Sequence, residues 1–88
     1  MRANHDFLLR EIAGESILLP VGEAAQRMSG LVDLNESGTL LWKKLEKDCT
    51  EQELVEALLQ EYDVSEATAK ADVKKFIVKM REAGLIID

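Results

Sequence analysis

The chain has 88 residues, 47% of them hydrophobic, which is enough for one small domain with its own core. Seventeen acidic and eleven basic residues give a net charge of −6, which disfavours a dedicated nucleic-acid-binding protein. The single cysteine, Cys49, excludes an internal disulfide and suits a reducing cytoplasm. Early charged residues exclude a signal peptide, and no apolar run is long enough for a membrane span. We therefore expect one cytoplasmic domain over residues 1–88 and no membrane partner.

Residues 7–12 and 16–21 are short apolar runs that predict an antiparallel hairpin. Gly14 lies between them and can supply the positive φ that a tight turn needs. Pro20 cannot donate to a ladder, which indicates an edge or a strand end. The residues expected on the buried face of the second run are the alternating ones, Ile17, Leu19 and Val21.

Residues 22–30 contain two glycines and predict a loop with room for one helical turn. Residues 31–34 then predict a third strand. The residues expected on one of its faces are Val32 and Leu34, and those expected on the other are Leu31 and Asp33.

Two helices are expected after this strand. Asn35 is a good N-cap for the first, which is expected to end near Lys47. Thr50 and Glu53 form a capping box that opens the second. The residues expected to face inward are Leu41, Trp42, Leu45, Leu54, Val55, Leu58, Leu59 and Tyr62.

Ser65 caps a third helix over residues 66–83, and Gly84 occupies its C′ position. The expected core stripe is Ala69, Val73, Phe76, Ile77 and Met80. The helix is locally basic in an acidic chain, with Lys70, Lys74 and Arg81 beside one edge of the stripe and Lys75 and Lys79 beside the other edge, near Asp72. Two interpretations stay open: a solvated face with favourable dipole contacts at the helix end, or a positive wall beside a groove for an acidic ligand.

The residue types needed for catalysis are scarce. His5 is the only histidine and lies in a terminus expected to be frayed, so no histidine-based acid–base pair or metal cluster can be built. Cys49 has no histidine or second cysteine near it in sequence, and no phosphate-cradling glycine loop is present. We expect no enzyme, no metal and no cofactor.

The sequence resembles the PqqD family, the small proteins of pyrroloquinoline quinone biosynthesis and their relatives, from about residue 7 to residue 86. The matching residues are 7–14, 17–25 and 30–35, then Gly38, Trp42, Leu45, Thr50 and 53–55, then 62–64, Asp72, Val73, Phe76, Met80, Gly84 and Leu85. Their order and spacing carry the resemblance, since most are core and cap positions. The sequence departs from the family at Asp48 and Cys49, where relatives commonly have a glycine-containing turn.

The resemblance implies a winged-helix-like α+β domain, with a three-stranded antiparallel sheet followed by a three-helix bundle (βββααα). It also implies a non-catalytic adaptor for the leader of a ribosomally made precursor peptide. Such an adaptor presents the peptide to a modifying enzyme, often a radical S-adenosylmethionine enzyme. The peptide is held as an extra strand on the third strand, against the third helix.

On this resemblance, the expected peptide-binding residues are Leu31, Val32, Asp33, Leu34, Lys70, Val73, Lys74, Phe76 and Ile77. If the Asp72 edge of the helix faces the strand instead, Lys75 and Lys79 take over the basic role. A proline at Val32 is expected to abolish binding, provided that its N–H points outward. Two alternatives remain: a winged-helix DNA-binding regulator, and an accessory subunit that binds an enzyme without leader recognition.

Overall fold

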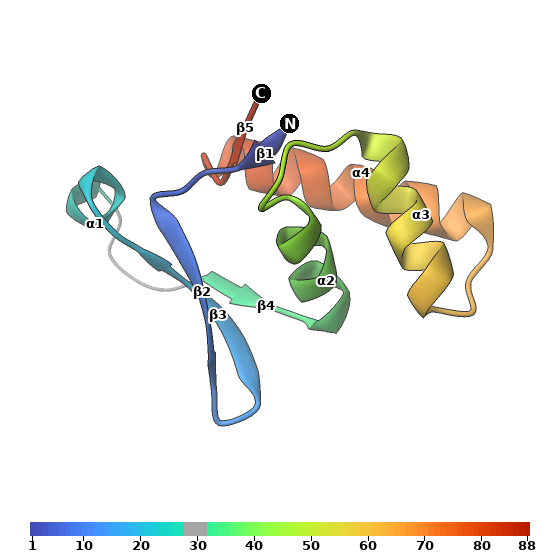
Figure 1. Ribbon diagram of the computed structural model, residues 1–88, viewed down its shortest axis with the longest axis horizontal. Coiled ribbons are helices and arrows are strands. Elements are labelled where there is room, and N and C mark those ends of the chain that lie inside the picture. Colours follow the sequence, from blue (N-terminus) through green and yellow to red (C-terminus); the bar gives the residue numbers. More distant parts are fainter. Residues whose placement is uncertain (28–31) are drawn as a thin grey trace.

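The computed structural model describes residues 1–27 and 32–88, and its α+β architecture matches the expected one (Figure 1). The main sheet is antiparallel and has the order β2–β3–β4. Its strands are β2 (Phe7–Ile12), β3 (Glu15–Pro20) and β4 (Val32–Leu34). Three helices follow, α2 (Glu36–Lys44), α3 (Glu51–Glu61) and α4 (Glu66–Glu82). The predicted sheet followed by a three-helix bundle is confirmed.

A two-residue turn joins β2 to β3. Ala13 and Gly14 have φ values of 53° and 81°, the pair of left-handed residues that defines a type I′ turn. The prediction for the core face of β3 is only partly right. It named Ile17, Leu19 and Val21, whereas the fully buried residue of β3 in the main core cluster is Leu18. Ile17 is also buried but lies outside that cluster, on the opposite face of the strand. The run is apolar on both faces, so alternation alone could not identify the core face.

The helix starts are the predicted ones. The Asn35 side chain accepts from the Gly38 N–H at 2.8 Å at the start of α2, and Thr50 and Glu53 form the capping box of α3. Ser65 caps α4, which ends before Gly84 with its φ of +77°. The α2 helix ends at Lys44, earlier than the predicted end near Lys47, since its C-cap is Leu45.

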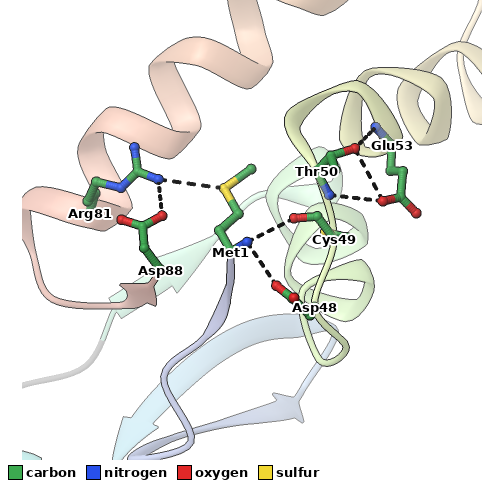
Figure 2. A network of polar contacts seen from close by, with 7 residues as sticks. All are labelled: Met1, Asp48, Cys49, Thr50, Glu53, Arg81 and Asp88. Carbon is green, nitrogen blue, oxygen red and sulfur yellow. Dashed lines mark hydrogen bonds and ion pairs between the residues drawn. The ribbon is translucent and has the colours of Figure 1, made fainter.

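The N-terminal segment is held in place, so the expectation of a frayed terminus is wrong. Strand β1 (Arg2–Ala3) pairs with β5 (Ile86–Ile87), and the Ala3 N–H donates to Leu45 O at 2.7 Å. In Figure 2 the Met1 ammonium lies 2.9 Å from Asp48 Oδ1, within the loop before α3. Strands of two residues are too short to show a periodic pattern, so they could not be predicted from the sequence.

A short helix, α1 (Glu23–Arg27), supplies the helical turn expected in the segment after the hairpin. It lies at the far side of the sheet from the helical bundle (Figure 1). In the part of the chain that the structure describes, no helix is both long and apolar enough to cross a membrane.

Candidate functional site

Strand β4 lies at the edge of the sheet, and the strand register shows which of its backbone groups face outward. Residues of an antiparallel pair alternate between hydrogen-bonded and non-hydrogen-bonded positions. Ile12 and Glu15 close the two-residue hairpin as a hydrogen-bonded pair. Beyond the other end of β3, Val21 is also hydrogen-bonded on the β2 side, because its N–H donates to Asp6 O at 2.7 Å. The odd-numbered residues of β3 therefore bond to β2, and the even-numbered ones bond to β4.

This alternation sets the direction of each residue in β4. Val32 and Leu34 are the partners of even-numbered residues of β3, so their N–H and C=O groups point into the sheet. Asp33 opposes Ile17, and its N–H and C=O point away from β3. The prediction that a proline at Val32 abolishes peptide binding required an outward N–H at that residue. The Val32 N–H points inward, so this requirement is not met. Asp33 provides the outward backbone donor and acceptor among the described residues of this strand.

A groove of about 330 Å³ runs between the end of β4 and helix α4. Its apolar floor is formed by Leu34, Gly38, Leu41, Leu58, Phe76 and Met80. Gly38 keeps this floor open, because a Cβ there would lie 3.0 Å from Asn35 Oδ1 and 3.7 Å from Phe76 Cε1. Phe76 is only partly buried, unlike the rest of the α4 core stripe, so its ring is available to a ligand.

The edge of α4 that lines this groove is the one that carries Asp72, Lys75 and Lys79. All three side chains are exposed, and none forms an ion pair with the residues that the structure describes. Within the described part of the chain, the groove is therefore flanked by two unpaired ammonium groups and one unpaired carboxylate. The edge of α4 that faces β4 is therefore the Asp72 edge, a point that the helical wheel left open.

The other predicted lysines lie elsewhere. Lys70 and Lys74 line a separate pocket against α3, and Lys70 forms an ion pair with Glu66 at 2.9 Å. Val73 and Ile77 are buried in the core rather than exposed as groove walls. Of the expected site residues, the structure brings Asp33, Leu34 and Phe76 together at the groove, with Val32 beside them in the strand, and Leu31 lies outside the described residues.

A second pocket of about 320 Å³ opens beside the groove at the start of α2. Leu58, Tyr62 and Val64 form its apolar part, and Glu36 and Asp72 contribute the carboxylates that line it. Partial burial raises the pKa of the Tyr62 hydroxyl, and the carboxylates of Glu36 and Glu61 act in the same direction. The helical spacing of Tyr62 predicted a core position, and nothing in the sequence indicated this pocket.

A wider depression of about 850 Å³ continues from there toward the hairpin. It is lined by five carboxylate residues, Glu11, Glu15, Asp33, Glu36 and Glu61. Lys43 is the basic residue of this lining, and it is engaged by Glu11 at 3.2 Å. The site therefore changes sign along its length, from ammonium groups beside Phe76 to carboxylates around the start of α2.

Comparison with known families now identifies the domain. The family model described as coenzyme PQQ synthesis protein D (PqqD) matches residues 9–86. The chain belongs to the PqqD family. The matched segment of this PqqD-family protein includes the described part of β4 and all of α4, so the whole groove lies within it. No curated protein sequence matches the chain.

Two solved structures share the fold of this PqqD-family chain. TbiB1, in complex with the TbiA(beta) leader peptide, has 23% sequence identity and a TM-score of 0.77, and the match covers 100% of each chain. Lasso peptide synthetase B1, complexed with the leader peptide, has 17% identity and a TM-score of 0.76. That match covers 99% of this chain and 96% of the other. At these identities the similarity shows a common fold.

Proposed function

We propose that this PqqD-family protein is a non-catalytic adaptor that binds the leader of a ribosomally made precursor peptide. The leader lies as an added strand on β4, against α4, and is presented to a modifying enzyme of the radical S-adenosylmethionine type. The observation that carries the proposal is the outward backbone of Asp33 beside a groove with an apolar floor. Both solved relatives of the same fold are complexes with leader peptides, which supports it.

The physical basis is strand addition combined with side-chain pockets. Main-chain hydrogen bonds at a sheet edge give affinity with little dependence on sequence, and each contributes about 0.5–1.5 kcal/mol. Alternate side chains of the added strand point to one face, where the floor around Phe76 can receive an apolar residue. The pocket then supplies the selectivity that the main chain lacks.

A DNA-binding role receives less support from the distribution of charge on α4. Of its five basic residues, Lys70 is paired with Glu66 and Arg81 with Asp88. A net charge of −6 also opposes the phosphate neutralisation on which DNA affinity depends. We place the complex in the cytoplasm, which suits the free thiol of Cys49.

The experiment is a ¹⁵N NMR titration with a synthetic leader peptide encoded by a short reading frame next to this gene, with duplex DNA as the control. The proposal predicts shifts in Val32–Leu34 and on the Asp72, Phe76 and Lys79 edge of α4. Shifts along α4 with DNA, and none with the peptide, would mean that only the fold is shared with peptide-binding relatives.

A further inference from the structure

The pocket beside Tyr62 has the chemistry of a site for a long basic side chain. Leu58 is buried at its floor, and Tyr62 and Val64 supply further apolar surface. The exposed Glu36 and Asp72 lie in the same lining, and neither forms an ion pair within the described residues. Lysine and arginine bury their alkyl stems on such surfaces while their charged ends remain near carboxylates. The Tyr62 ring adds a face that attracts a cation.

This pocket is continuous with the groove, because both are lined by Asn35, Ser37, Leu58 and Asp72. Along α4, Asp72, Phe76 and Lys79 follow one another at intervals of about 6 Å and about 4.5 Å, at 1.5 Å per residue. Alternate residues of an extended strand are about 6.6 Å apart on one face. Three alternate residues of a bound strand can therefore meet an acidic, an apolar and a basic position in turn.

The direction of the bound strand follows from the direction of β4. In Figure 1, β4 runs toward α2 while α4 runs the opposite way across the molecule. Asp72 lines both hollows together with Asn35, the residue that follows β4, and Lys79 lies two helical turns further along α4. Antiparallel pairs are the commoner and slightly more stable kind. A strand antiparallel to β4 thus enters at the Tyr62 pocket and leaves past Lys79.

We propose that the peptide bound on β4 carries the order basic–x–apolar–x–acidic from its N-terminus. Its basic side chain occupies the Tyr62 pocket between Glu36 and Asp72, and its apolar side chain lies on Phe76. Its acidic side chain meets Lys75 and Lys79. The inference rests on the proposed function and adds the side-chain class and the direction of the peptide. Charge at both ends of the groove then fixes the register that main-chain pairing alone leaves free.

The test is a selection of random dodecapeptides displayed on phage against the intact protein. The peptides that bind are synthesised, and their binding position is determined by ¹⁵N NMR. We expect enrichment of lysine or arginine four residues before aspartate or glutamate, with an apolar residue between them. Replacing that basic residue with norleucine should weaken binding about five- to tenfold, and the Tyr62 ring signals should no longer shift.

Variants of the protein provide the matched control. The double variant Glu36→Gln, Asp72→Asn should lose the preference for a basic residue while still binding the norleucine peptide as before. The double variant Glu46→Gln, Glu82→Gln changes the net charge equally at exposed positions that do not line the groove or the pocket, and it should keep the preference.

Three outcomes separate the proposals. Peptides that bind along β4 with no charge order would overturn the inference and leave the adaptor function standing. Enrichment of the opposite order, acidic before basic, would overturn the antiparallel direction. Peptides that shift no residue of β4, or a selection that yields no binder, would count against both strand addition and the inference.

Discussion

Substitution of Asp33 by proline tests strand addition at a single backbone position. The Asp33 N–H points away from β3, so proline removes the donor available to a peptide and leaves the bonds between β3 and β4 in place. Loss of one main-chain bond costs about 0.5–1.5 kcal/mol, and the unpaired peptide carbonyl raises the total to about 1–3 kcal/mol. We therefore expect binding of the leader peptide to weaken by about fivefold to about 150-fold, at 1.4 kcal/mol for each factor of ten.

The assay is fluorescence anisotropy with a labelled leader peptide, read alongside the thermal unfolding of each variant. Asp33→Ala is the matched control, because it removes the same carboxylate and keeps the N–H. Val32→Pro is the contrasting variant: it removes a donor that faces β3, so it should destabilise the fold. A folded Asp33→Pro protein that binds as tightly as Asp33→Ala would refute the reasoning.

Three further predictions concern the groove and the stability of the fold. Reversing Lys75 and Lys79 to glutamate should weaken binding of a peptide with an acidic residue by about 1–2 kcal/mol, and more at low salt than at high salt in the same anisotropy assay. Replacing the Asn35 cap with alanine should cost about 1 kcal/mol of unfolding free energy in urea denaturation, because the Gly38 N–H loses its acceptor. The hydrogen bond from the Met1 ammonium lowers the pKa of the Asp48 carboxyl. This contact should therefore stabilise the fold above the pKa that Asp48 has in the unfolded chain, and the stabilisation should be lost as the pH falls through the lower pKa of the folded state.

Each of these predictions has its own control. The lysine reversal is matched by Lys70→Glu, Lys74→Glu on the opposite edge of α4; an equal loss from both pairs would mean that long-range charge, not the groove, is responsible. The cap prediction fails if Asn35→Ala leaves the urea midpoint unchanged. The acid titration is followed by carboxyl NMR, and an Asp48 pKa at its ordinary value would show that the Met1 contact does not hold in solution.

The same contact has an alkaline counterpart. The hydrogen bond to Asp48 is the main cause that raises the pKa of the Met1 amino group. A raised folded pKa means that this stabilisation is complete below the unfolded value and is lost as the pH rises through the folded one. Asp48→Asn should remove both the acidic and the alkaline dependence.

Local chemistry made most of the fold predictable. Asn35, Thr50 and Ser65 cap their helices as expected because each side chain bonds to a backbone N–H only a few residues away. Gly14 likewise marked a turn that depends on two residues alone. The β1–β5 pair was not predictable, since its strands are short and joined only through tertiary packing.

The site was harder to predict than the fold because it depends on how α4 is rotated against β4. The helical wheel of α4 placed lysines beside both edges of its core stripe, and nothing local distinguishes Lys74 from Lys75. Gly38 lets the Phe76 ring approach α2 and so determines which edge of α4 faces β4. Because Gly38 lies in another helix, the pattern of α4 alone could not show this. The inward direction of Val32 follows from the hairpin register, which becomes certain only once the strand pairing is seen.

Strand addition on β4 can be tested directly by hydrogen–deuterium exchange of the β4 backbone amides, measured by NMR with and without the leader peptide. We expect Val32 and Leu34 to be protected in both states, because both bond to β3. Asp33 should exchange rapidly in the free protein and become protected when the peptide is bound. An Asp33 amide that stays unprotected in a peptide-saturated sample would contradict strand addition on β4.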